Sequence, residues 1–251
     1  MHIIPCSATT ISADRIRRSF THFEMTELPS HISIDSPGFA QDAYFRDLGA
    51  IVWVIDVQDE YLSSINALIQ TAVVLAENYP RVHFEVFIHK TDGLGDEYRY
   101  DAFREIRQRV QDELSDLGFG HMEVSFYQTS IFDHSIFEAM SKVVQRLLPQ
   151  LPALEALLNR LCSTCGMQKA YLFDTTSKIY VATDASPTFL KDYEVCSDYV
   201  DVIVDIKALY GWRSGSRPDS KQAGGDEEIG ESIVTFERSG DAYIYAREIT
   251  E

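Results

Sequence analysis

The stretch Val82–Leu94, VHFEVFIHKTDGL, joins a strand-like apolar run to a polar loop that carries a lysine and an aspartate two residues apart. Continuous runs of Val, Phe and Ile are typical of strands buried in a parallel sheet, and this run ends abruptly at His89. In an open parallel sheet, ligands bind beyond the carboxyl ends of the strands. The sequence therefore predicts that Lys90 and Asp92 lie where such a sheet would hold a ligand.

Strand and helix periods alternate on both sides of this stretch. Ala50–Ile55, AIVWVI, and Met122–Tyr127 are further strand-like runs, and apolar residues at helical spacing fill the segments between and after them. One such stripe, Phe103 to Leu117, is followed by Gly118, a residue that often ends helices. This alternation predicts an α/β fold whose parallel sheet is covered on both faces, with AIVWVI buried on both sides.

The pattern changes at Pro149–Pro152, because proline lacks an N–H group and pushes its predecessor out of helical geometry. We predict two domains there, residues 1–149 and residues 152–251. The second shows a helix, two short strands, a longer helix and a carboxyl-terminal hairpin, which is typical of an α+β domain with an antiparallel sheet. Residues 213–230 are rich in Gly, Ser and charge, so a mobile loop is expected, and the pattern assigns it no role.

Composition excludes several classes of function. The chain has 251 residues with 39 acidic and 22 basic side chains, which gives a formal net charge of −17. Such a surface repels phosphate backbones, so nucleic acid is not an expected partner. The sequence shows neither a signal peptide nor an apolar run long enough to cross a bilayer. We expect a cytoplasmic protein that reaches a membrane only through its partners.

Two other groups of residues suggest a zinc site and a hydrolytic triad, but both have simpler structural explanations. Cys162 and Cys165 have zinc-like spacing, yet no second ligand pair is evident and they fall in a helical pattern, which favours buried helix cysteines. Ser130, Asp133 and His134 contain the residue types of a hydrolytic triad. Residues so close at one helix start do not readily point at a common atom, and helix capping explains them better.

Asp92 offers the chemistry of guanine recognition. A carboxylate there can accept two hydrogen bonds, from the N1 and N2 hydrogens of guanine, and the edge of adenine offers no such pair. Lys90 can lay its aliphatic stem along the base and ribose while it ties neighbouring loops together. The alternative is an ordinary strand-to-helix loop with Asp92 as a helix cap, and the loop alone does not decide between the two.

Two further loops extend this hypothesis. Thr129–Ile131 follows the next strand, where the Ser130 hydroxyl and backbone N–H groups can buttress Asp92 and contact the guanine oxygen; capping of the next helix is the alternative. Upstream, Asp35 and Gly38 fit a D-x-x-G loop, in which the Asp holds Mg²⁺ through water and the Gly N–H meets the terminal phosphate. The order of the three loops, each after a strand, favours a nucleotide site.

Long segments of the chain resemble the C/D type of Rag GTPases, called Gtr proteins in fungi. The resemblance is carried by FEVFIHKTDGL (residues 84–94), by SFYQTSIFDHSIFEAMSKVVQRLLPQLPALEALLN (125–159) and by KAYLFDTTSKIYVATDASP (169–187). His89, in place of the usual Asn of the guanine motif, is itself characteristic of that family. The similarity extends over about residues 33–210.

The resemblance implies a Ras-like parallel-sheet G domain followed by an α+β roadblock or longin-type domain. It implies GTP, GDP and Mg²⁺ as ligands, and an obligate heterodimer with an A/B-type Rag. It further implies docking on a lysosomal or vacuolar scaffold complex and relay of amino-acid status to the TOR kinase complex. The residues expected at the guanine are His89, Lys90, Asp92, Ser130 and Ile131, and those on the Mg²⁺ and phosphate side are Asp35 and Gly38.

The chain departs from the family pattern upstream of Gly38. It shows no phosphate-binding G-x-x-x-x-G-K-[ST] loop, and residues 7–20, SATTISADRIRRSF, look like a capped basic helix instead. Both domains are expected to be incomplete. Missing coding sequence is the favoured explanation, and a genuine pseudo-GTPase scaffold that dimerises without binding or hydrolysing GTP is the alternative. GTP hydrolysis by the chain as written is doubtful, and no catalytic residue is assigned.

Overall fold

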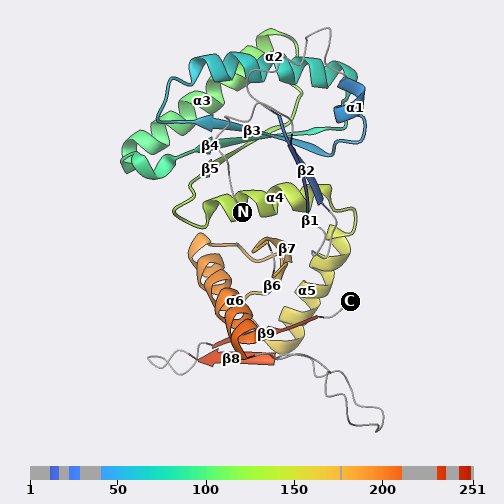
Figure 1. The fold of residues 1–251 in the computed structure, drawn as a ribbon, viewed down its shortest axis with the longest axis vertical. Coiled ribbons are helices and arrows are strands. Elements are labelled where there is room, and N and C mark those ends of the chain that lie inside the picture. Colours follow the sequence, from blue (N-terminus) through green and yellow to red (C-terminus); the bar gives the residue numbers. More distant parts are fainter. Residues whose placement is uncertain are drawn as a thin grey trace.

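The structure is a computed structural model, which describes residues 12–16, 23–28, 41–175, 177–210, 231–235 and 243–249. Its central feature is a parallel sheet of three strands, β3 (Ala50–Asp56), β4 (His83–His89) and β5 (Val124–Thr129), in that order (Figure 1). The prediction of an α/β fold with a parallel sheet is therefore confirmed.

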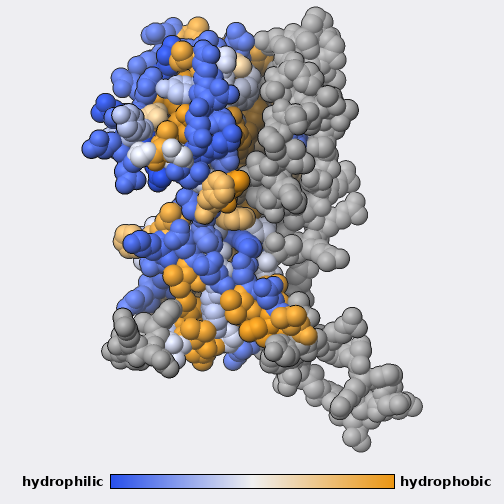
Figure 2. Space-filling model, turned by 60° about the vertical axis from the view of Figure 1, so that its left-hand side comes forward, coloured by the Kyte–Doolittle hydropathy of each residue, from blue (hydrophilic) through white to orange (hydrophobic). Residues whose placement is uncertain are grey.

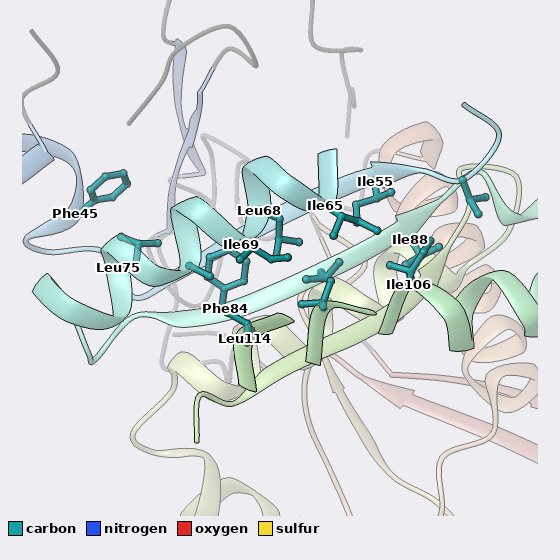
Figure 3. Packing of buried hydrophobic residues seen from close by; sticks show 14 residues of the cluster. Phe45, Ile55, Ile65, Leu68, Ile69, Leu75, Phe84, Ile88, Ile106 and Leu114 are labelled. Carbon is teal, nitrogen blue, oxygen red and sulfur yellow. The ribbon is translucent and has the colours of Figure 1, made fainter. Parts of the chain in front are cut away.

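Helices cover both faces of this sheet. α2 (Leu62–Asn78) and α3 (Asp96–Asp116) lie on one face, and α4 (Ser135–Leu147) lies on the other (Figure 1). Alternate residues of β4 point to opposite faces, as the two-residue period of a strand requires. Figure 3 shows the packing on the first face, where the buried side chains include Ile55, Ile65, Leu68, Leu75, Phe84, Ile88, Ile106 and Leu114.

A buried ion pair joins the sheet to α4. Glu85, in the middle of β4, has a fully buried side chain, and Arg146 donates from Nη1 to Glu85 Oε1 at 3.2 Å. Arg146 also reaches the exposed Glu123 at 3.2 Å through Nη2. A buried carboxylate is tolerated only with a cation or hydrogen-bond donors beside it, so Arg146 is what allows a charged residue in this strand.

α4 also packs against a second, smaller sheet. β6 (Tyr171–Phe173) and β7 (Tyr180–Thr183) form an antiparallel pair on the side of α4 away from the parallel strands (Figure 1). The Ser141 hydroxyl accepts the Tyr180 N–H at 3.1 Å, and Gln145 donates to the Tyr180 carbonyl at 3.1 Å. These bonds and the apolar contacts around them make α4 a layer shared by the first half of the chain, up to the end of α4, and the second half, which follows it.

Two long helices and a hairpin complete the second half. α5 (Leu151–Cys165) packs against β7 and carries Pro152 in its first turn, where a proline is tolerated. α6 (Leu190–Tyr210) begins beside the start of α4, and β8 (Glu231–Thr235) pairs antiparallel with β9 (Tyr243–Arg247). The predicted helix break between α4 and α5, the two short strands and the hairpin are confirmed, while the expected loop at 213–230 lies outside the described residues.

The amino-terminal part corrects one prediction. Within the segment expected to be a basic helix, Ser12–Ile16 is a strand, β1, paired antiparallel with β2 (Phe23–Glu27). Backbone pairing with a segment further along the chain stabilises a strand there, and no local pattern reveals such a partner. A five-residue helix, α1 (Gln41–Phe45), follows, and Phe45 packs into the core of the first face.

Two expectations about burial were wrong, whereas the predicted end of the helix at Gly118 agrees with the structure. Val54 is 51% exposed, because β3 lies at an edge of the described sheet and α4 covers only the earlier residues of that strand face. Cys165 is exposed and Cys162 only half-buried, since α5 has no buried residue at all. Leu117 is exposed beyond the end of α3, and Gly118 follows with the positive φ of +87° that ends such helices.

Candidate functional site

The carboxyl ends of the three parallel strands lie side by side. The register pairs Asp56 of β3 with His89 of β4, and His89 with Thr129 of β5. The loops that leave these strands therefore start from one edge of the sheet, where open α/β sheets bind their ligands. The sequence predicted this meeting for the loops after β4 and β5.

Lys90 joins the loop after β4 to the loop after β3. Its backbone is left-handed, with φ of 63°, and its ammonium group forms an ion pair with Asp56. Gln58 donates from Nε2 to the Lys90 carbonyl at 2.8 Å. The prediction that Lys90 ties neighbouring loops is confirmed, whereas Asp56 and Gln58 were missed, although Asp56 directly follows the AIVWVI run.

The ion pair changes the acidity of both partners. The hydrogen bond to Asp56 and its negative charge raise the pKa of Lys90. Partial burial by itself raises the pKa of Asp56, but the hydrogen bonds from Lys90 and from the Gln58 N–H, with the lysine charge, outweigh it and hold that pKa below its usual value. Both side chains therefore remain charged at neutral pH, which keeps the two loops attached.

Asp92 and Ser130 are in direct contact. The Ser130 hydroxyl donates to Asp92 Oδ1 at 2.6 Å, and Ser130 is fully buried while Asp92 is exposed. Asp92 is the middle residue of a short 3₁₀ turn, η1 (Thr91–Gly93). The buried Ser130 thus fixes one carboxylate oxygen of Asp92, while the Asp92 side chain remains accessible to solvent. The predicted buttressing of Asp92 by Ser130 is confirmed.

The loop after β5 orders its own backbone. The Ser130 N–H donates to the Ser135 hydroxyl at 2.9 Å, and the Phe132 N–H donates to the Ser130 hydroxyl at 3.0 Å. Within the part of the chain that the structure describes, the Ile131 N–H has no acceptor, and Ile131 is exposed. The Ile131 N–H is therefore a free backbone donor next in sequence to Ser130, in the loop predicted to meet the guanine oxygen.

The capping alternative is partly correct for the same loop. Asp133 accepts the N–H of Ser135, the first residue of α4, at 2.9 Å, and also its hydroxyl. The N-cap position itself is His134, which makes no side-chain capping bond. Asp133 thus stabilises the helix start while Ser130 is directed to Asp92, so capping and ligand positioning are divided between two residues.

His89 lies beneath the loops rather than in them. It is buried, and its Nδ1 lies 3.0 Å from Thr129 Oγ1. Burial, and then the neighbouring Lys90 charge, lower the pKa of His89 below its usual value, so its imidazole is neutral at neutral pH. The residue predicted at the guanine therefore serves in this structure as a neutral link between the ends of β4 and β5.

Gly93 leaves room for the side-chain amide of Gln58. A Cβ atom at this position would lie 2.1 Å from Gln58 Nε2, the group that donates to the Lys90 carbonyl. Glycine therefore allows the loops after β3 and β4 to pack together. Asp35 and Gly38, predicted for the Mg²⁺ and phosphate side, lie outside the described residues.

The α/β fold and the polar loops at its strand ends define a Ras-like G domain. The family model of the Gtr1/RagA G protein conserved region matches residues 6–200. The chain is 44% identical over 98% of its length to the GTP-binding protein gtr2 of Schizosaccharomyces pombe, of which it covers 76%. It is 42% identical over 93% of its length to the human Ras-related GTP-binding protein C, of which it covers 57%.

A relative of another type is less similar. The Ras-related GTP-binding protein A of Dictyostelium discoideum is 23% identical over 58% of the chain, which covers 47% of that protein. The chain therefore belongs to the Gtr1/RagA family of G proteins, and its similarity places it with the Gtr2 and Rag C/D type.

Proposed function

We propose that the chain is a guanine-nucleotide-binding subunit of the Rag/Gtr type, with GTP and GDP as ligands and Mg²⁺ as the accompanying ion. The observation that carries the proposal is the Ser130–Asp92 contact, which fixes an exposed carboxylate at the carboxyl edge of a parallel sheet. A fixed carboxylate matches the paired N1 and N2 donors of guanine, and a charged acceptor makes both hydrogen bonds strong.

The neighbouring groups complete the recognition of the base. The free Ile131 N–H donates to the guanine O6, and the stem of Lys90 covers a face of the base while its ammonium group stays on Asp56. Neutral His89 holds the ends of β4 and β5 together through Thr129. Asp92 and Lys90 are thus each held by a second residue before the ligand arrives, which lowers the entropy cost of binding.

The alternative, a scaffold that binds no nucleotide, gains no support from the comparisons. The two relatives of the Gtr2 and Rag C type named above are themselves described as GTP-binding proteins. Hydrolysis remains unassigned to any residue of this chain.

We further propose a heterodimer with an A/B-type Rag, formed by a roadblock-type domain at residues 152–251 that follows the G domain at 1–149. Its support is the apolar surface of the second half, visible over α6 and the hairpin in the lower part of Figure 2. Large apolar side chains are exposed there in a number unusual for a subunit that functions alone. They include Val195, Val202, Ile206 and Leu209 of α6, and Ile233, Val234, Tyr243 and Tyr245 of the hairpin.

The cellular setting is proposed from the family resemblance. The heterodimer would sit in the cytoplasm at the vacuolar or lysosomal surface, on a scaffold complex, and relay amino-acid status to the TOR kinase complex. Among the helices that the structure describes, none combines the length and apolarity needed to span a bilayer. A partner is therefore the proposed route to the membrane.

The first experiment counts nucleotides. The chain is co-expressed with an A/B-type Rag, the complex is purified, and the nucleotide released by denaturation is quantified by chromatography. More than one guanine nucleotide per heterodimer is expected. One equivalent or less, accounted for by the partner, would instead favour the scaffold alternative.

The second experiment tests the guanine contact. Asp92→Asn is expected to weaken GDP binding about 10- to 100-fold, because two hydrogen bonds to a charged acceptor are lost. The amide that replaces the carboxylate can donate to the C2 oxygen of xanthine, so XDP is expected to bind the variant better than GDP. Asp96→Asn, an exposed carboxylate four residues on, is the matched control. An unchanged preference for GDP over ADP and XDP in Asp92→Asn would refute the assignment.

A further inference from the structure

We infer that α6, a helix of the second half, positions the guanine loop through His134. This inference rests on the proposed function for its meaning, since the loop it concerns is the one that holds Ser130 against Asp92. His134 is not a ligand contact in this proposal. It is a positioning residue: its contacts with α6 fix the start of α4, and the start of α4 fixes the loop at the nucleotide site.

His134 makes two contacts with α6. Its Nε2 lies 3.1 Å from Asp198 Oδ1, and the edge of its ring meets the ring of Tyr193 at 6.1 Å between centroids with an interplanar angle of 87°. Figure 1 shows the first turns of α6 beside the start of α4, where His134 lies. The edge-to-face ring contact and the polar contact with Asp198 together fix both the plane and the tip of the imidazole.

Tyr193, which His134 contacts, is itself held firmly in place. Tyr193 is fully buried, its hydroxyl donates to the Lys178 carbonyl at 2.7 Å, and its ring stacks on Phe173 at 5.8 Å with an interplanar angle of 12°. Lys178 in turn pairs with Asp201 of α6 at 2.5 Å. A shift of α6 therefore moves Tyr193 and Asp198 together, and His134 with them.

The path from His134 to the nucleotide site is short. His134 is the N-cap of α4, and the next residue, Ser135, accepts the Ser130 N–H at 2.9 Å through its hydroxyl. Ser130 then donates to Asp92 at 2.6 Å. Two hydrogen bonds thus separate the residue held by α6 from the carboxylate proposed to read the base. The remaining hydrogen bonds of this loop, from the Phe132 N–H to Ser130 and from Ser135 to Asp133, stay within the loop and the start of α4.

The exposure of Asp198 sets how much its loss should speed nucleotide release. The Asp198 side chain is 70% exposed, so its contact with His134 stabilises the loop only modestly. Asp198→Ala is therefore expected to speed guanine-nucleotide release only about two- to fivefold. His134→Ala removes the ring contact as well, and about tenfold faster release is expected from the two losses together.

The test uses the full chain in its heterodimer and reads the loop directly. Hydrogen–deuterium exchange of the peptide that covers Ser130–Ser135 is measured without nucleotide, in the wild type, Asp198→Ala and His134→Ala. Lys207→Ala is the matched control, because it removes the ion pair of α6 with Glu248, at the far end of the helix from His134. Release of a fluorescent GDP is measured on the same proteins, and His134→Gln, which keeps a donor for Asp198, tests for rescue.

The expected result is faster hydrogen exchange in Ser130–Ser135 for Asp198→Ala and a larger increase for His134→Ala. Lys207→Ala is expected to leave exchange there unchanged, and His134→Gln is expected to recover it in part. Unchanged exchange in His134→Ala, or an equal change in Lys207→Ala, would overturn the inference. If exchange rises as expected but the chain holds no guanine nucleotide, the proposed function fails while the positioning role stands. If nucleotide binds and its release is insensitive to His134→Ala, the positioning role fails alone.

Discussion

The two sides of α4 contrast in how they use apolar residues. On the side of the parallel sheet, the apolar residues of β4 and α4 are buried in closed clusters, and the charged Glu85 among them has its own cation. On the other side, α5 buries none of its residues, and α6 exposes a row of Val, Ile and Leu side chains. The sheet of the first half is thus covered on both faces, whereas α5 and α6 leave much of their apolar surface exposed.

The proposed function gives the two halves separate tasks, and this difference is consistent with them. Ligand recognition needs groups fixed in advance, and the buried first half supplies them at its strand ends. Association needs apolar area that remains exposed until a partner covers it. α4 belongs to both cores, so changes in the second half reach the first through a helix rather than through a loose linker.

The largest expected effect comes from breaking the buried ion pair. Arg146→Met leaves the Glu85 carboxylate buried without its cation, and we expect a loss of about 3–5 kcal/mol in the free energy of unfolding. Lys178→Met, which breaks the half-exposed pair with Asp201 in the second half, is expected to cost at most about 1 kcal/mol. Denaturant unfolding of the purified chain measures both. Similar losses for the two variants would remove the contrast between the halves.

The next largest effect on stability is expected at Leu68, and Leu209 provides the comparison. Leu68 is fully buried in α2, and Leu68→Ala is expected to destabilise the chain by about 2–5 kcal/mol. Leu209 of α6 is 80% exposed, and Leu209→Ala is expected to change stability by less than about 0.5 kcal/mol. If this surface meets the A/B-type partner, the same variant weakens the heterodimer measurably in a binding titration. A Leu209→Ala variant that unfolds as easily as Leu68→Ala would show that α6 is closed within its own chain.

The sequence predicted the first half better than the second for a physical reason. The strand period and the helix period both indicate which face of an element is apolar, and on the face of the sheet that α2 and α3 cover, each apolar side packs against the next elements along the chain. The contact between Ser130 and Asp92 was predictable because both residues directly follow parallel strands. The same argument applied to β3 would have found Asp56.

Periodicity does not reveal what covers an apolar face. The stripe along α5 suggested buried cysteines, yet Cys165 is exposed because no other element of the described chain covers that side. β1 was missed because its partner strand, β2, lies further along the chain and no local pattern marks the pairing. Gln58 was missed because its contact with the Lys90 carbonyl depends on the packing of two loops 32 residues apart.

A smaller loss of stability is expected from Gly93→Ala, which tests the packing between the loops after β3 and β4. Gly93→Ala places a Cβ 2.1 Å from Gln58 Nε2, so the flexible Gln58 side chain must leave the Lys90 carbonyl. The loss of one hydrogen bond is expected to cost about 0.5–1.5 kcal/mol. At Gly95 the nearest atom to an added Cβ is 3.9 Å away, so Gly95→Ala is the control and is expected to change stability less. Equal losses at both positions would show that the contact of Gly93 with Gln58 is unimportant.

The smallest effect concerns pH and the buried His89. Burial lowers the pKa of His89 below its ordinary value of 6.5, so between the two values the unfolded chain binds more protons than the folded chain. Stability therefore falls as the pH drops through 6.5 and is unaffected by this residue well above it.

His89→Asn removes the titrating group, because an amide does not take up a proton in this range. We expect the variant to lose less stability than the wild type between about pH 7.5 and pH 5.5, by denaturant unfolding at each pH. His121→Asn, at an exposed histidine, is expected to leave the wild-type pH dependence in place. A wild-type pH dependence in His89→Asn as well would mean that other groups govern acid sensitivity. His89 would then link β4 to β5 without making that link sensitive to protons.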